Sequence, residues 1–212
     1  MRDFDEIREF VEREIVPRYD NFDAGHDRNH VQTVISQALS LAEYYPEVDR
    51  CMLLIAAAYH DLGLINGREH HHTDSARIIR KDSRLRQWFS DEEINTIADA
   101  AEDHRASSDH EPRSMLGRLV AEADRQIDGE TIVRRAIQYS LANYPQLDRN
   151  GHYRRMAGHV REKYGEGGYL HLWVPESPNA RRLEAFRNLL AEEHALRALF
   201  DRLYPVKSSA VK

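Results

Sequence analysis

Apolar residues recur at helical spacing along most of this chain, and sustained alternation of the strand type is missing. One such set is Phe4, Ile7, Phe10, Val11 and Ile15. The pattern predicts an almost entirely α-helical protein. The expected helices span residues 2–16, 28–45, 49–62, 73–82, 90–104, 113–127, 129–141, 151–164 and 178–202.

Several of these boundaries have a local cause. Pro17 and Pro46 are expected to end helices, and Ser90 followed by Glu93 forms a capping box. The segment Gly165–Asn179 holds three glycines, two aromatic residues and two prolines, which predicts a long loop or a short hairpin. Glycines that fit turns stand at positions 63, 67 and 129.

A wholly apolar run, Cys51–Ala58, is followed closely by His60 and Asp61. The run suits a helix packed inside the protein, and burying two polar side chains at its end needs a physical reason. Metal coordination is one such reason, whereas capping or a buried hydrogen bond is the structural alternative. The single cysteine, Cys51, is interpreted as a core residue.

Further imidazoles and carboxylates occur on both sides of this pair. They are His30, His70, His71, His72, His104 and Asp124. Together with His60 and Asp61, these donors suit divalent first-row metals such as manganese, iron, cobalt, nickel or zinc, and magnesium is also compatible.

The ordered set resembles the HD-domain superfamily of metal-dependent phosphohydrolases. The resemblance runs from about Gly25 to Asp128 and includes the opening motif Gly25-His26-Asp27-Arg28-Asn29-His30-Val31. It implies an all-α, single-domain HD-type helical bundle spanning residues 1–212, with an HD core at about 25–128, a metal site between helices and additional C-terminal helices.

The resemblance also implies the metal ligands. His30, His60, Asp61 and Asp124 would hold one ion, and His71 and His104 accompany a second ion in HD proteins that carry them. Asp61 would bridge the two ions, which would share a hydroxide nucleophile. Aligning Ser75-Ala76 with the residues that follow the third histidine in HD proteins selects His71, while His70 and His72 also fit a solvated histidine cluster.

Catalytic roles are expected for Asp61, which is also a predicted ligand, and for His26, Asp27 and Arg105. His26 or Asp27 would protonate a leaving group or hold a ligand, although Asp27 equally fits the N-cap of the helix that carries His30. Arg105 and Arg28 suit phosphate contacts, against the alternative that both are surface arginines.

Composition and charge limit the classes of partner that we expect. A chain of 212 residues can form one domain, and a net charge of −6 with a pI of about 6.1 argues against a general affinity for nucleic acid. No apolar stretch approaches the ~20 residues that cross a bilayer, so we expect a cytoplasmic protein with no membrane partner. A homo-oligomer is left open.

We therefore expect an enzyme that cleaves a phosphomonoester or phosphodiester of a small phosphorylated metabolite, with a nucleotide favoured, by attack of a metal-bound hydroxide. Two alternatives remain. One is a di-iron oxygenase on the same helical framework, which uses dioxygen to cleave a carbon–carbon or carbon–phosphorus bond. The other is a non-catalytic module that binds a nucleotide or a metal for regulation.

Overall fold

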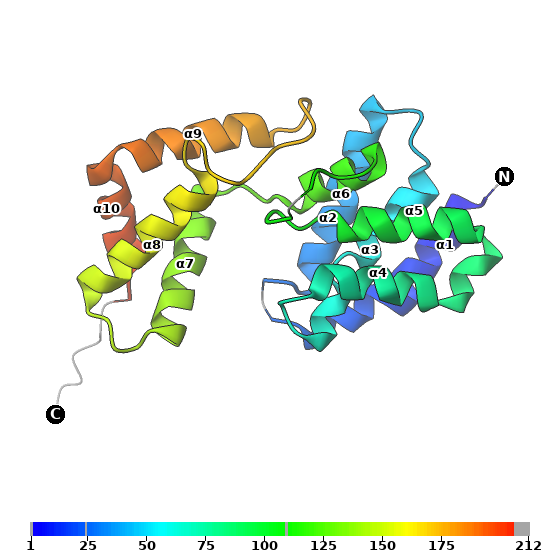
Figure 1. Ribbon diagram of the computed structural model, residues 1–212, viewed down its shortest axis with the longest axis horizontal. Coiled ribbons are helices and arrows are strands. Elements are labelled where there is room, and N and C mark those ends of the chain that lie inside the picture. Colours follow the sequence, from blue (N-terminus) through cyan, green and yellow to red (C-terminus); the bar gives the residue numbers. More distant parts are fainter. Residues whose placement is uncertain (1, 24, 109, 206–212) are drawn as a thin grey trace. The chain divides into compact units, whose positions relative to one another are not determined.

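The computed structural model describes residues 2–23, 25–108 and 110–205. All regular elements in these ranges are helices, which confirms the all-α prediction (Figure 1). The chain divides into two compact units. Unit 1 comprises Met1–Arg125 and Leu172–Ser177, and unit 2 comprises Gln126–His171 and Pro178–Lys212. One domain over residues 1–212 stays a prediction.

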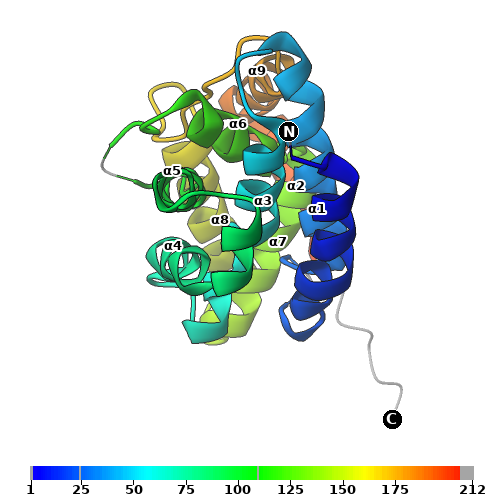
Figure 2. The ribbon, with the colours of Figure 1, turned by 90° about the vertical axis from the view of Figure 1, so that its right-hand side faces the viewer.

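Unit 1 contains the first six α-helices. They are α1 Phe4–Phe10, α2 Arg28–Leu41, α3 Arg50–Tyr59, α4 His71–Lys81, α5 Asp91–Glu102 and α6 Met115–Asp124. Shorter helical turns connect them at Val11–Ile15, Val16–Asn21, Ala42–Tyr44, Leu62–Asn66 and Ser83–Gln87. Figure 2 shows α4 and α5 side by side, and these two helices pack against each other.

The N-terminal helix differs from the prediction that it would stop at Pro17. The α-helix ends at Phe10, a π-helical turn follows over Val11–Ile15, and a 3-10 helix carries the chain past Pro17 to Asn21. Proline is tolerated there because it lies in the first turn of the 3-10 helix, where its missing N–H group is not needed. The predicted capping box of Ser90 and Glu93 is confirmed.

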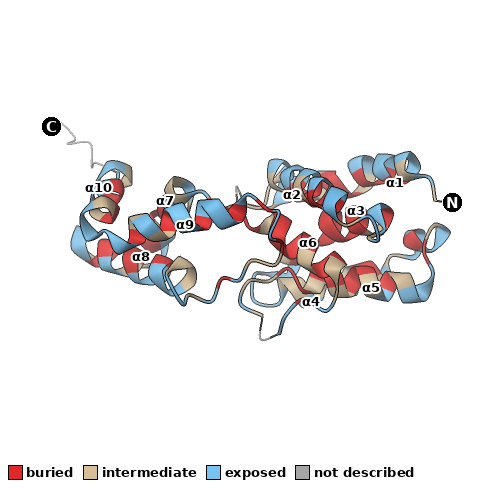
Figure 3. Cartoon of the chain, turned by 90° about the horizontal axis from the view of Figure 1, so that it is seen from above, coloured by how far each residue is buried: buried red, intermediate tan, exposed pale blue. Residues whose placement is uncertain are grey.

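Helix α3 is the centre of unit 1. Its residues from Leu53 to Tyr59 are all buried, and it packs against α1, α2, α5 and α6. Figure 3 colours these buried positions red. Because α3 is enclosed by other helices, the residues that follow its C-terminal end also lie in the interior.

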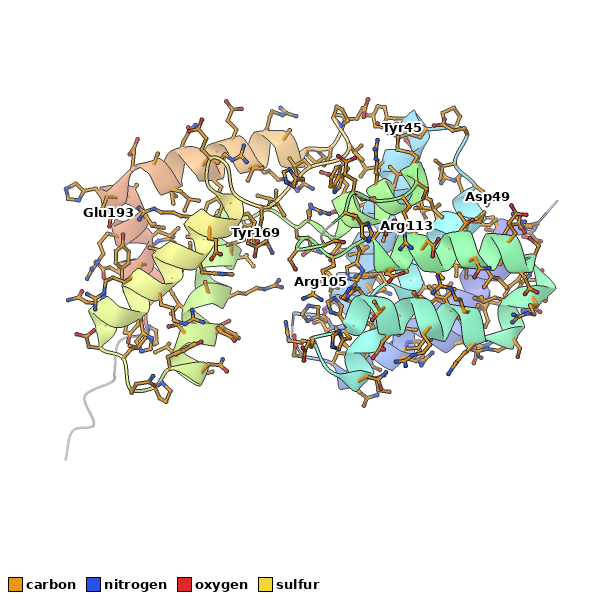
Figure 4. The ribbon with its side chains drawn as sticks, viewed as in Figure 1. Tyr45, Asp49, Arg105, Arg113, Tyr169 and Glu193 are labelled. Atoms are coloured by element: carbon orange, nitrogen blue, oxygen red, sulfur yellow. The ribbon has the colours of Figure 1, made fainter. Side chains whose placement is uncertain are left out.

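A strap from the far end of the sequence, Leu172–Ser177, completes unit 1. Val174 is 2% exposed and belongs to the same apolar core as α3. The backbone N–H of Trp173 donates to Glu122 Oε2 at 2.9 Å, and Tyr45, labelled in Figure 4, donates its hydroxyl to Glu176 at 2.6 Å. The strap therefore holds α6, which carries Glu122, against the core.

Unit 2 contains α7 Gly129–Asn143, α8 Arg149–Tyr164, α9 Asn179–Ala191 and α10 Glu193–Leu203 around an apolar core of its own. The prediction of one helix over 178–202 was wrong, because Glu192 adopts an extended backbone with φ −93° and ψ 98°. The break lets α10 pack against α7 and α8. The apolar spacing continues through Glu192 without a glycine or proline, so the sequence did not reveal it.

The segment 165–178 is a loop without a strand. Its Tyr169 and Leu170 donate their backbone N–H groups to the carbonyls of Glu162 and Lys163 at the end of α8. No helix within the described ranges is long and apolar enough to cross a membrane.

Candidate metal centre

The six predicted ligands lie at the ends of five helices of unit 1. His30 is in the first turn of α2, His60 and Asp61 follow α3, and His71 begins α4. His104 comes two residues after α5, and Asp124 is the last residue of α6. His60, Asp61 and His104 are at most 3% exposed.

Four of these residues form a first cluster, namely His30, His60, Asp61 and Asp124. The Nε2 atoms of His30 and His60 are 3.3 Å apart. Asp61 Oδ2 lies 3.4 Å from His30 Nε2 and 3.1 Å from His60 Nε2. Asp124 Oδ1 lies 3.3 Å from His30 Nε2 and 3.7 Å from His60 Nε2. Four donor atoms positioned by three helices, α2, α3 and α6, therefore surround one point.

Asp61, His71 and His104 form a second cluster. The Nε2 atoms of His71 and His104 are 3.1 Å apart. Asp61 Oδ1 lies 3.6 Å from the His71 nitrogen and 3.4 Å from the His104 nitrogen. Asp61 thus turns one oxygen toward each cluster, which is the arrangement of a bridging carboxylate.

Hydrogen bonds from Nδ1 fix the ring orientation of three of these histidines. The Nδ1 atoms of His60, His71 and His104 lie 2.7, 2.7 and 2.5 Å from the carbonyl oxygens of Ala57, Arg68 and Ala101. A carbonyl oxygen only accepts, so each Nδ1 carries a proton and each ring turns its Nε2 atom toward the cluster.

The Nε2 atoms of His71 and His104 face each other across 3.1 Å. A proton or a metal ion held between or beside them would satisfy both nitrogens. Imidazole nitrogens and carboxylate oxygens are ligands for divalent transition metals, so the donor set fits such ions.

The electrostatics of the first cluster favour positive charge. Burial alone would raise the pKa of Asp61 and of Asp124, but the neighbouring histidines outweigh it and hold both values well below the usual range. Burial opposes protonation of His60, yet Asp61 and Asp124 raise its pKa well above the usual value. A proton or a metal ion can supply that positive charge.

His71 behaves in the opposite way. Burial and then the neighbouring His104 lower the pKa of His71 to about 4. The ring is therefore neutral near pH 7, with its Nε2 lone pair ready to bind a metal without first losing a proton.

Two residues that the sequence did not single out as functional position this centre. Tyr19 is fully buried, donates its hydroxyl to the Ala58 carbonyl at 2.8 Å and receives the backbone N–H of Asp61 at 3.4 Å. Gly63 allows α4 to begin directly beside Asp61, since a Cβ there would lie 1.9 Å from the His71 carbonyl oxygen. The Gly63 N–H also donates to Ser75 Oγ at 2.9 Å.

The opening motif contributes differently. Asp27 is the N-cap of α2 and accepts the backbone N–H of His30 at 2.9 Å, so the capping alternative describes its contacts. The His26 ring lies 5.6 Å from the His30 ring, and its Nδ1 is 2.9 Å from Asp23 Oδ1. The Arg68 side chain contacts both Asp23 and His26. Asp23 and Arg68 were missed because neither belongs to the motif that carries the predicted ligands.

The arginines expected to contact phosphate already have protein partners. Arg105, labelled in Figure 4, donates to Ser107 Oγ at 3.0 Å and to the Glu69 carbonyl at 2.7 Å, and it lies 3.2 Å from His72 Nδ1. It therefore ties the segment before His71 to the end of α5. Arg28 pairs with Asp20 through its Nε and one terminal nitrogen, each donating to a different carboxylate oxygen.

The neighbouring histidines take no part in the two clusters. His72 lies beside Arg105, and burial followed by that guanidinium lowers its pKa. His70 is exposed and lies 3.7 Å from the Glu69 carboxylate. Of the three adjacent histidines, His71 alone joins the described donor groups.

Comparison with known proteins gives one result. The family model described as HD domain matches residues 28–127, which include all six ligands. Searches of curated proteins and of solved structures return no match. The matched segment, the helical fold and the predicted motif agree, and together they support the assignment of residues 28–127 to the HD-domain superfamily.

Proposed function

We propose that this protein is a metal-dependent phosphohydrolase that cleaves a phosphomonoester or phosphodiester of a small metabolite, with a nucleotide as the favoured substrate. HD domains are mostly metal-dependent hydrolases, and the family match supports this class. The observation that carries the proposal is Asp61, whose two oxygens face two separate donor clusters.

Charge supports a phosphorylated substrate. Asp61 and Asp124 give the six ligands two negative charges when the imidazoles are neutral, which balances one divalent cation. A second ion would leave the centre net positive, and a net positive centre favours an anionic phosphoester. Bound divalent ions would lower the pKa of a water molecule and neutralise charge on the phosphoryl oxygens.

The chain's own residues would hold and orient these groups. His60, His71 and His104 keep their Nε2 atoms aimed inward through hydrogen bonds to carbonyls. His26, paired with Asp23 beside His30, is placed to pass a proton to a leaving oxygen. Asp27 positions His30 through the cap, and Arg105 holds the approach to His71 and offers cationic charge to the substrate.

The test is a metal-by-substrate panel. The purified chain is stripped with a chelator, reloaded separately with manganese, iron, cobalt, nickel, zinc or magnesium, and assayed on p-nitrophenyl phosphate, bis-p-nitrophenyl phosphate and nucleoside mono-, di- and triphosphates. We expect metal-dependent release of product, abolished by Asp61→Ala and unchanged by His194→Ala, an exposed histidine of unit 2.

Three outcomes would contradict the proposal. Full turnover by Asp61→Ala would remove the bridging role. Oxygen uptake by the iron-loaded protein without phosphoester cleavage would favour the di-iron oxygenase. Absence of any turnover by the metal-loaded, folded chain would favour the regulatory module.

A further inference from the structure

The net charge of −6 is an average of two units of opposite sign. Unit 1 holds 27 Asp and Glu residues against 16 Lys and Arg, a net charge of −11. Unit 2 holds nine Asp and Glu residues against 14 Lys and Arg, a net charge of +5. The whole-chain net charge therefore does not exclude nucleic-acid binding by unit 2 taken by itself.

Aromatic rings and a guanidinium meet on one side of the α7–α8 pair. The Arg155 Cζ lies 3.8 Å from the centre of the Tyr144 ring and 5.4 Å from the centre of the Tyr139 ring. The two rings are 6.5 Å apart, and Tyr139 remains 57% exposed. Arg155 Nε is buried and has no hydrogen-bond partner among the described residues.

An arginine and a histidine border these rings. Arg135 precedes Tyr139 by four residues on α7 and so lies on the same side of that helix. His159 follows Arg155 by four residues on α8, and burial together with Lys163 and Arg155 lowers its pKa. We call Arg135, Tyr139, Tyr144, Arg155 and His159 the α7–α8 face.

The arginines of this face lack the carboxylate partners that some other arginines of unit 2 have. Within the described residues, no carboxylate pairs with Arg135 or Arg155, whereas Arg134 pairs with Glu130 at 2.6 Å and Arg161 pairs with Glu193. An unpaired arginine keeps its donors for an external anion.

We propose that the α7–α8 face binds single-stranded nucleic acid. Arg135 and Arg155 would contact phosphates, and the exposed ring of Tyr139 would stack on a base. A single strand is favoured over a duplex because its bases are open to stacking on an aromatic ring, and stacking tolerates any sequence. This surface lies in unit 2, so its binding does not depend on the metal centre of unit 1.

Fluorescence anisotropy with a labelled oligothymidylate of about 16 nucleotides, in the presence of EDTA, tests the proposal on the full chain. Two phosphate contacts predict a salt slope of about −1.4, so affinity should fall about sevenfold between 50 and 200 mM salt. A duplex of the same length should bind more weakly.

Matched variants separate stacking from charge. Tyr139→Ala should weaken binding by about tenfold or more, while Tyr139→Phe, which keeps the ring, should retain it. Arg135→Ala should weaken binding and reduce the salt slope by about 0.7. The neighbouring Arg134→Ala, which removes a paired arginine on another side of α7, should bind normally, and so should Asp61→Ala.

Four results would overturn the proposal. The first two are no anisotropy change at low salt and equal affinity for duplex and single strand. The third is binding that is insensitive to Tyr139→Ala and displaced by heparin, which indicates a general polyanion surface. The fourth is salt-sensitive self-association without oligonucleotide binding, which indicates that this basic unit docks on the acidic unit 1 of a second copy.

Discussion

His71→Ala is the substitution that separates two metal positions from one. His71 Nε2 approaches only the second cluster, at 3.6 Å from Asp61 Oδ1 and 3.1 Å from His104 Nε2. Removing the ring leaves two donors there, Asp61 and His104, which is fewer than the three protein ligands of a typical catalytic site. The four donors of the first cluster remain.

We therefore expect the chelator-stripped original chain to rebind two ions and the stripped variant to rebind one ion per chain. Loss of groups that merely orient a ligand costs about 10- to 100-fold in metal affinity, so loss of a direct ligand should weaken the second ion by at least about 100-fold, or about 2.7 kcal/mol. The first ion should change by much less.

Isothermal titration with manganese or zinc, combined with elemental analysis of the dialysed protein, measures both numbers. The fold should persist, because the side chain is 18% exposed and its Nδ1 hydrogen bond contributes only about 1 kcal/mol. Circular dichroism checks this. His30→Ala is the matched variant, since it leaves three donors in each cluster and should weaken the first ion without changing the stoichiometry.

Two results would refute the reasoning. If folded His71→Ala binds two ions with unchanged affinity, His71 is not a ligand. If it loses both ions together, the two clusters act as one indivisible site rather than as two that share Asp61.

Two further predictions concern stability and local packing. Gly63→Ala places a methyl group against the His71 carbonyl, so we expect a loss of about 1–3 kcal/mol in urea denaturation and loss of the second ion; a normal metal content would contradict this. Asp82→Asn removes a carboxylate that accepts from Tyr59 and Arg84. Burial opposes ionisation of the Asp82 carboxylate, but the hydrogen bonds from Arg84 and Tyr59 outweigh burial and lower its pKa. Its contribution to the free energy of unfolding is therefore present above the unfolded pKa of about 3.9 and is lost as pH falls through the lower folded pKa. The variant should therefore be less stable by about 1–3 kcal/mol at pH 7, with the difference shrinking below about pH 4, and a difference that stays constant from pH 7 to 3 would exclude this ionic origin.

The sequence allowed the helices and the donor group to be anticipated for a clear physical reason. The polar pair His60 and Asp61 stands out because it ends an apolar run, and such a contrast is visible in one dimension. The break at Glu192 is not visible in this way, since it arises from the packing of α10 on α7 and α8 rather than from a helix-breaking residue.

Supporting residues were harder to anticipate than ligands. Tyr19 looks like any core aromatic, and Gly63 looks like a turn glycine, until their distances to Asp61 and His71 are known. Likewise, the opposite net charges of the two units partly cancel in any whole-chain count. The positive net charge of unit 2 is therefore visible only after the chain is divided.

The strap 172–177 has a consequence for how this protein can be cut and how it folds. A chain ending at residue 125 would keep every ligand, yet it would leave a gap where Val174 packs and would remove one donor to the Glu122 carboxylate, two residues before Asp124. Unit 1 therefore cannot finish folding until a segment almost fifty residues further along the chain has been synthesised. Closing that long loop costs conformational entropy, so the strap is expected to pack late in folding. Fragments lacking the strap should be prone to aggregate, and supplying residues 172–177 as a separate peptide offers a direct way to rescue them.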